Sequence, residues 1–119
     1  MKSKTGGLRY NEDKLKWGLV DFDALDNMVR VLMYGEQKYD AHNWKKGLPY
    51  VSVTESMLRH IYAFLRGEDV DPESGLPHTG HIMCNAMFLD YYWQHHKDMD
   101  DRFIDNAKKK ENSTEQESS

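Results

Sequence analysis

Two acidic residues near the end of a predicted helix suggest metal-ion chemistry. Residues 24–40 have the spacing of an amphipathic helix, and Glu36 falls on its apolar stripe with Asp40 one turn later. Burying a carboxylate is costly unless it is paired or bound to a metal, so two inward carboxylates predict a ligand pair for a hard cation. The alternative is a helix that ends early and leaves both side chains in solvent. The stripe consists of Leu25, Met28, Val29, Leu32 and Met33.

Glu55 and Asp90 are the other two candidate metal ligands. Ser52 and Glu55 have the spacing of a capping box, which would give Glu55 a structural role at the start of a second helix. Helices joined by a short loop are usually antiparallel, so this start should also lie beside Glu36 and Asp40. The roles of cap and ligand both stay open for Glu55. Asp90 is predicted to point inward among the apolar residues of a third helix.

Cationic and aromatic residues on both sides of the first helix suit a nucleotide. Arg9 and Lys14 precede the helix with Trp17 nearby, and cations beside aromatics fit a phosphate and a stacked base. Loop 41–49 follows the carboxylate pair and is well placed to contact a ligand. The alternatives are a surface arm for the first segment and a plug at the edge of the core for Trp44. The predicted substrate contacts here are Arg9, Lys14, Lys38, Asn43, Trp44 and Lys45.

The histidines give further candidates. His60 lies at the edge of the apolar stripe of the second helix, where it could reach a ligand or make a structural hydrogen bond. His81 and Asn85 lie on the flank of the third helix and are predicted to contact the substrate. His78, His81 and Cys84 have a zinc-like spacing, but their angles drift around a helix and no fourth ligand follows, so we do not assign a zinc site.

Three helices would position these residues. Asp21 or Asp23 can cap the first, which runs to about residue 40. The second covers roughly residues 53–66, and Pro77 can open the third. The acidic segment 67–77 lacks the twelve-residue calcium-binding pattern and is interpreted as a loop. The sequence therefore predicts an all-α bundle of three to four helices.

Size and composition narrow the function classes. The chain has 119 residues and a net charge of −4, so we expect one domain and no basic nucleic-acid surface. No apolar run approaches the roughly 20 residues that span a membrane, and a single cysteine excludes an internal disulfide, which together predict a soluble cytoplasmic protein. The domain is predicted over residues 1–107, with a disordered charged tail at 108–119. Three helices bury limited apolar surface, so a homo-oligomer is expected to complete the core.

Several motifs resemble a known family. They are Gly7-Leu-Arg-Tyr-Asn with Lys14-Leu-Lys-Trp, then Tyr34-Gly-Glu-Gln-Lys-Tyr-Asp-Ala-His-Asn-Trp, and Leu58-Arg-His with the segment that runs from Gly67 to the histidines of the third helix. Over residues 6–95 the chain resembles the phage and bacterial dATP/dGTP diphosphohydrolase domain. That family is akin to the all-α, MazG-like nucleoside triphosphate pyrophosphohydrolases.

The resemblance implies a reaction and a cofactor. It implies hydrolysis of a purine deoxynucleoside triphosphate to the monophosphate and pyrophosphate, with Mg²⁺, or alternatively Mn²⁺, held by helix carboxylates. Glu36 and Glu55 stand where the first member of each MazG-like carboxylate pair would be, which makes them the predicted catalytic residues, whereas Tyr39 and Leu58 fill the second positions. The residues left to complete such a site are Asp40, His60 or Asp90.

Two other function classes compete with this one. An HD-type phosphohydrolase needs an adjacent His-Asp pair, and no His-Asp dipeptide occurs in the sequence. A non-catalytic helical module that binds a nucleotide or a protein would leave its acidic residues in solvent. Burial of Glu36 and Asp90 would favour the enzyme over such a module, because a binding module has no reason to bury unpaired carboxylates.

Overall fold

Every regular element in the described part of the chain is helical. The computed structural model describes Gly7 and residues 13–104. The three α-helices are α1 (Asp26–Lys38), α2 (Tyr50–Leu65) and α3 (His78–His95). The short 3-10 helices are η1 (Trp17–Leu19), η2 (Phe22–Leu25), η3 (Asn43–Lys46) and η4 (Lys97–Met99). The prediction of a small all-α bundle is confirmed.

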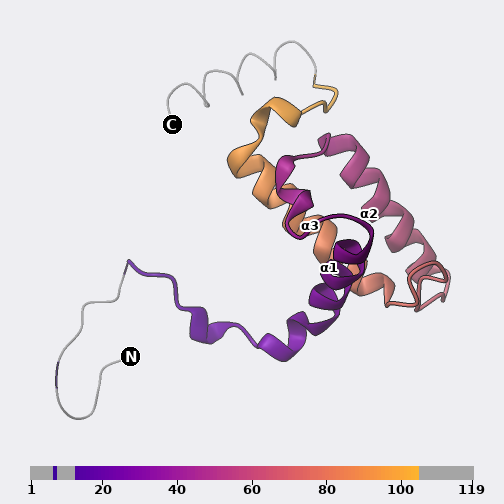
Figure 1. Ribbon diagram of the computed structural model, residues 1–119, viewed down its shortest axis with the longest axis horizontal. Coiled ribbons are helices and arrows are strands. Elements are labelled where there is room, and N and C mark those ends of the chain that lie inside the picture. The colour runs from indigo at the N-terminus through magenta and orange to yellow at the C-terminus, as the bar shows by residue number, and fades with distance from the viewer. Residues whose placement is uncertain (1–6, 8–12, 105–119) are drawn as a thin grey trace.

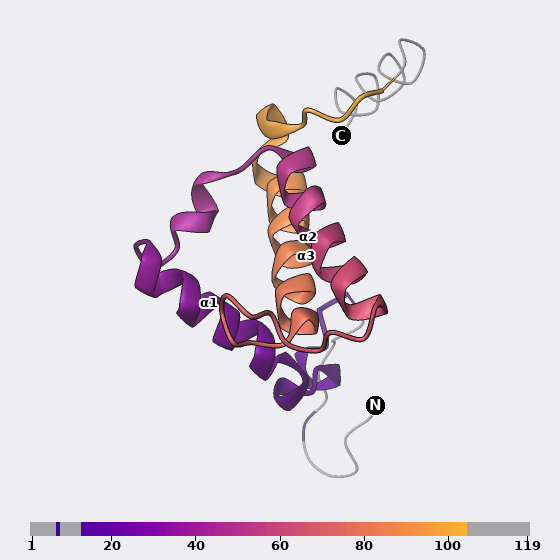
Figure 2. The same ribbon diagram turned by 90° about the vertical axis from the view of Figure 1, so that its right-hand side faces the viewer.

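The central helix of the bundle is α3, against which both other helices pack (Figure 1). α2 runs antiparallel to α3. The start of α2 accordingly lies beside the end of α3, where the Tyr50 hydroxyl donates a hydrogen bond to the Tyr92 carbonyl at 3.0 Å. α1 crosses α3 near its start and diverges from it further on (Figure 2). At the crossing, a Cβ atom on Gly80 would lie 2.8 Å from the Asn27 carbonyl oxygen. Only glycine lets the two backbones approach this closely.

The best-buried cluster lies where the start of α2 meets the end of α3. Tyr50, Val53 and Tyr92 are buried there, with Trp44 and Phe88 packed against them. The Trp44 and Phe88 rings stack with centroids 4.9 Å apart, and the Tyr92 hydroxyl donates a hydrogen bond to the Trp44 carbonyl. Large aromatic side chains with satisfied polar ends contribute strongly to the stability of a small core. This cluster therefore anchors one end of the bundle.

The first and third helices begin close to where the sequence predicts. The Asp21 carboxylate accepts a hydrogen bond from the Asp23 backbone N–H at 3.0 Å, and this cap opens η2, which leads directly into α1. Pro77 immediately precedes the first residue of α3, His78. Both starts follow from residues that suit the first turn of a helix.

The start of α2 is a correction to the sequence analysis. The helix begins at Tyr50, directly after Pro49, whose ring fixes φ at a value suited to helix entry. Ser52 and Glu55 therefore lie inside the helix, and both are exposed. The first turn is instead capped from a distant part of the chain, since the Val51 N–H donates to the Asp101 carboxylate at 2.9 Å. The predicted capping box is wrong, so Glu55 has no capping role.

The end of α1 is a second correction. α1 stops at Lys38 because Tyr39 adopts an extended conformation, with φ −133° and ψ 177°. The chain then reaches His42, which has a positive φ of 63° and cannot continue a right-handed helix. Asp40 lies beyond the helix, so the predicted one-turn spacing between Glu36 and Asp40 is wrong, and the alternative of an early helix end is confirmed.

Several large apolar side chains are exposed in the single chain, including two of the predicted apolar stripe of the first helix. On α1, Val29 and Met33 are 45% and 59% exposed. The others are Leu58, Phe64, Leu65 and Trp93. The homo-oligomer stays a prediction, and these are the side chains that a second copy would cover.

None of the described helices combines the length and apolar character needed to cross a membrane. The predicted boundary at residue 107 and the predicted tail at 108–119 lie outside the described residues.

Candidate functional site

The segment between α2 and α3 folds into a compact turn that presents Asp71. Val70 and Pro77 form an isolated antiparallel bridge, and the Asp71 N–H donates to the Leu76 carbonyl at 2.9 Å. The Ser74 N–H donates to the Asp71 carboxylate at 3.0 Å. A short side chain that accepts a hydrogen bond from the backbone a few residues on is a common way to stabilise such a turn. These bonds fix the position of the Asp71 carboxylate.

The turn forms one side of a polar cavity of about 470 Å³, which we call the histidine cleft. His60 enters it from α2, His78 and His81 from α3, and Asp71 from the turn. Other residues of its wall are Tyr34, Lys38, Ser56, Arg59, Glu68 and Glu73. The cleft therefore combines three imidazoles and three carboxylates with two cationic side chains.

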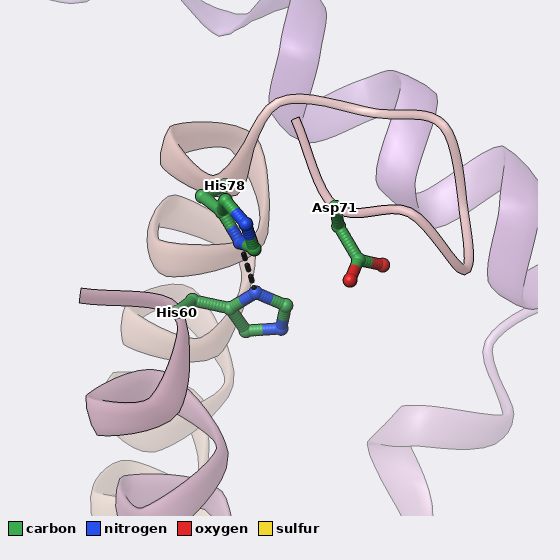
Figure 3. Close-up of side chains that lie close together, drawn as sticks. All are labelled: His60, Asp71 and His78. Atoms are coloured by element: carbon green, nitrogen blue, oxygen red, sulfur yellow. Dashed lines mark hydrogen bonds between the residues drawn. The ribbon is translucent and has the colours of Figure 1, made fainter. Parts of the chain in front are cut away.

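The polar side chains of the histidine cleft contact one another directly. The His60 and His78 Nδ1 atoms are 2.9 Å apart (Figure 3). The His60 and His81 rings stack almost in parallel, with centroids 4.3 Å apart. His81 Nε2 lies 2.7 Å from the Ser74 hydroxyl and 3.7 Å from the Asp71 carboxylate. Three imidazoles thus gather around one carboxylate.

Burial favours the neutral form of two imidazoles of the cleft, those of His60 and His81. Desolvation, helped by the neighbouring His81, lowers the pKa of His60. Desolvation also lowers the pKa of His81, although Asp71 opposes the shift. For Asp71, desolvation raises the pKa, but hydrogen bonds from Ser74 and the nearby His81 outweigh it and hold the pKa below its usual value. At neutral pH, His60 and His81 therefore offer neutral imidazoles beside the ionised Asp71 carboxylate.

A second cavity, of about 460 Å³, adjoins the first, and we call it the apolar hollow. Tyr34 and His81 belong to the walls of both cavities. The remaining wall is mainly apolar and aromatic, formed by residues that include Val29, Leu32, Met33, Trp44, Leu48 and Phe88. A polar cavity with charged side chains of both signs and an apolar cavity are thus joined through two shared side chains.

Comparison with known proteins identifies the family. The family model described as "dATP/dGTP diphosphohydrolase, N-terminal" matches residues 4–102. The chain belongs to this family. A dATP/dGTP diphosphohydrolase of Salmonella phage PMBT28 is 31% identical over 96 residues, which cover 81% of this chain and 33% of that relative. The chain thus spans a third of the length of this curated relative. No solved structure matches the chain.

In this member of the dATP/dGTP diphosphohydrolase family, the four predicted carboxylates are all exposed: Glu36, Asp40, Glu55 and Asp90. Glu36 and Asp40 line the apolar hollow, and Asp90 accepts a hydrogen bond from Gln94 at 2.7 Å. The prediction of inward carboxylates is wrong for the single chain, because α3 does not cover the face of α1 that carries Glu36. Burial of Glu36 and Asp90 therefore gives no argument for an enzyme, and that argument has to come from elsewhere.

Five predicted substrate contacts lie in the two cavities. Lys38, His60 and His81 line the histidine cleft, and Asn43 and Trp44 line the apolar hollow. Lys38 also forms an ion pair with Glu73 at 3.1 Å across the cleft wall. Because Trp44 packs against the core, its interpretation as a plug at the core edge is confirmed, and stacking on a base stays a prediction.

The other predicted contacts lie outside both cavities or outside the described residues. Lys14 and Lys45 are exposed, and neither belongs to the cavity walls. The Asn85 amide lies 3.4 Å from the Ser56 hydroxyl, a contact between α3 and α2. Arg9 is not among the described residues.

Sequence reasoning missed Asp71 and His78 as partners of His60. The zinc-like spacing did indicate the correct helix, since His78 and His81 both reach the cleft. Cys84, however, is buried and lines the apolar hollow, and desolvation raises the pKa of its thiol to about 11. A thiol with such a pKa is a poor metal ligand at neutral pH. The partners of His78 instead come from α2 and the turn, which no local spacing can reveal.

Proposed function

We propose that the chain hydrolyses a purine deoxynucleoside triphosphate, dATP or dGTP, to the monophosphate and pyrophosphate. Family membership supports this reaction class, since both the family and the phage relative carry the name dATP/dGTP diphosphohydrolase. A runner-up is a non-catalytic helical module that binds the same nucleotide.

The observation that carries the proposal is the pairing of the two cavities. A nucleoside triphosphate has an apolar, aromatic base at one end and a polyanion at the other. The apolar hollow offers aromatic and aliphatic side chains to the base, and the histidine cleft offers Arg59 and Lys38 to the phosphates. Tyr34 and His81 line both cavities, so the ribose and α-phosphate would lie beside them. That is the position where the reacting bond must be.

His81 is the proposed general base. In the reaction a water oxygen bonds to the α-phosphorus, the bond from that phosphorus to the α–β bridging oxygen breaks, and pyrophosphate leaves. The water proton passes to an imidazole that is neutral at working pH, a state that the lowered pKa of His81 favours. Arg59 and Lys38 would stabilise the charge that develops on the phosphate oxygens.

Magnesium enters this proposal with the substrate. Mg²⁺ prefers oxygen ligands and usually binds through one or two carboxylates together with substrate phosphates. Among the described residues, the group compact enough to share a metal consists of His60, Asp71 and His78, which is not an oxygen-rich set and does not fit Mg²⁺. We therefore treat the substrate as the magnesium complex of the triphosphate, with Glu36 and Asp40 as the carboxylates to test.

The test is product analysis with variants that separate the two candidate sites. Purified protein is incubated with dATP, dGTP, dCTP or dTTP and Mg²⁺, and the products are separated by ion-exchange chromatography. Monophosphate and pyrophosphate should form in equal amounts from the purine nucleotides. His81→Gln should lower turnover by about 100-fold or more, as expected for the loss of a general base. His95→Gln, a change at an exposed histidine outside both cavities, is the matched control.

Other outcomes lead to different conclusions. Free phosphate and a diphosphate would indicate a different phosphohydrolase class. Loss of turnover in Glu36→Gln but not in His81→Gln would return the reaction to the carboxylates predicted from the sequence. Binding without turnover of any nucleotide by a folded protein would establish the binding module instead.

A further inference from the structure

The donor atoms at the centre of the histidine cleft have the spacing of metal ligands. His60 Nδ1 and His78 Nδ1 are 2.9 Å apart, and one donor atom from each of His60, Asp71 and His78 lies within 4.8 Å of the other two. Adjacent ligands at right angles on a metal, with bonds of about 2.1 Å, are about 3.0 Å apart, and opposite ligands are about 4.2 Å apart. The two nitrogens already match the spacing of adjacent ligands, and the Asp71 carboxylate oxygen lies within 4.8 Å of both, so an inward shift of this side chain would complete the set.

His78 carries an unsatisfied polar atom. The residue is 3% exposed, and its Nε2 atom is buried without a hydrogen-bond partner. Buried polar atoms are nearly always paired, so this one requires an explanation. The nearest carboxylate oxygen, on Glu68, lies 3.7 Å from it, just beyond hydrogen-bonding distance.

A bound cation accounts for both observations. Without a metal, the 2.9 Å contact requires one Nδ1 atom to carry a proton while the other accepts it. With a metal, both Nδ1 atoms are deprotonated and each Nε2 atom carries the hydrogen. His78 Nε2–H then faces Glu68, and a small shift would complete a carboxylate–histidine–metal arrangement of the kind that orients metal-binding histidines.

The three side chains come from separate elements that are each held in place. His60 lies on α2, and His78 is the first residue of α3, with its N–H bonded to the Asp69 carbonyl at 2.9 Å. Asp71 is fixed by the hydrogen bond from the Ser74 N–H. In Figure 3 the two imidazoles converge, and the Asp71 carboxylate lies on their open side. Such preorganisation lowers the entropic cost of binding an ion.

We propose that His60, Asp71 and His78 bind one divalent transition-metal ion of the Mn²⁺ to Zn²⁺ series. Imidazole ligands favour these ions over Mg²⁺, and three protein ligands leave coordination positions free for water or phosphate. The inference goes beyond the proposed reaction, because the site is assigned from donor atoms alone and its occupancy can be measured without a nucleotide.

The experiment is metal titration of the full chain, purified without a polyhistidine tag and stripped with a chelator. Co²⁺ is the probe, since its visible absorption reports coordination, and calorimetry gives the stoichiometry and affinity. The variants are Asp71→Asn, which keeps an acceptor for the Ser74 N–H, and His60→Gln, with His95→Gln as the matched control. Circular dichroism confirms that each variant is folded.

We expect one Co²⁺ per chain, bound about 100-fold more weakly in both cleft variants and unchanged in His95→Gln. Mg²⁺ at the same concentration should not displace the ion. Equal affinity in the wild type and both cleft variants, or displacement of Co²⁺ by equimolar Mg²⁺, would overturn the proposal. Because no nucleotide is present, a chain that binds Co²⁺ but hydrolyses nothing would refute the proposed reaction and still support the metal site.

Discussion

The histidine cleft and the apolar hollow have nearly the same volume but opposite construction. The cleft is built from side chains that contact one another, and a hydrogen-bonded turn closes it. The hollow is lined by apolar side chains of α1 and α3, and part of its wall, including Val29 and Met33, is largely exposed. The first has its polar partners in place, whereas the second has apolar surface that nothing in the single chain covers.

This difference suggests that the cleft is suited to specific chemistry and that the hollow is suited to less specific binding of apolar groups. Hydrogen bonds and ion pairs depend strongly on geometry, so a site that uses them must be preorganised. Apolar burial is non-directional, and a loosely shaped surface can still bind a base or a second copy of the chain. We therefore assign bond cleavage to the cleft and base binding to the hollow.

The largest predicted effect is a loss of turnover when the histidine cleft is altered and the apolar hollow is left intact. Asp71→Ala removes the acceptor for the Ser74 N–H and the carboxylate that lies 3.7 Å from His81 Nε2, and we expect turnover to fall about 100-fold or more, as for loss of the general base itself. Glu36→Gln on the wall of the hollow should change turnover by less than about threefold, which is under 1 kcal/mol. Steady-state kinetics on both variants measures the contrast. Equal losses would mean that the two cavities do not divide the work as proposed.

The next effect is on stability and concerns Trp44, which lines the apolar hollow and also packs against the core. Trp44→Ala removes a ring that stacks on Phe88 and should lower the free energy of unfolding by about 3 kcal/mol. Trp44→Phe keeps an aromatic ring there and should cost less than about 1.5 kcal/mol. Urea denaturation compares the two. A cost below about 1 kcal/mol for Trp44→Ala would show that the ring is not a packing element.

A smaller effect is the pH dependence of stability, which should come from the histidines of the cleft. Because His60 and His81 have lowered pKa values in the folded chain, the unfolded chain binds more protons once the pH falls below the ordinary histidine pKa of about 6.5. Their contribution to stability is present above this pH and is lost as the pH falls toward the folded pKa values. Tm should therefore decrease from about pH 7.5 to about pH 5.5, and less so in His81→Gln. An identical decrease in both proteins would exclude His81 as a cause.

The smallest effect on the single chain tests what covers the hollow. Met33→Glu places a charge on a side chain that is 59% exposed, so the stability of an isolated chain should change by only about 0.5 kcal/mol. If a second copy covers this face, the same change should convert the oligomer to monomer in light scattering. A wild-type protein that is already monomeric at high concentration would remove the homo-oligomer from consideration.

The sequence predicted which segments are helical better than it predicted the helix boundaries and the burial of side chains. Periodic apolar residues and local signals such as Asp21 and Pro77 identified all three helices, because these signals act within one turn. The α2 boundary was missed because Pro49 determined the start and Ser52 did not. Glu36 was wrongly predicted to be buried, because periodicity identifies an apolar face but does not say whether that face is covered.

The candidate site was only partly predictable for a related reason. His60 and His81 were expected to contact a ligand, and the structure places both in the cleft. Asp71 and His78 were not connected with His60, because the contact depends on α2 and α3 running antiparallel and on the turn between them. Sequence spacing reports neighbours along one helix, whereas this cluster joins three separate elements.

The glycine at the crossing of α1 and α3 also has a mechanical consequence. Gly80 lets the two backbones approach closely beside Asn27, two residues after His78, so this contact would be the fulcrum of any movement of α1. The opposite end of α1 lies about 16 Å along the helix from Asn27, at a rise of about 1.5 Å per residue. A rocking motion of α1 about the fulcrum would therefore move Glu36 and the mouth of the apolar hollow by several times more than it moves the first turn of α3. Such a motion of α1 would let the apolar hollow admit ligands of different sizes while His78, at the start of α3, keeps its position.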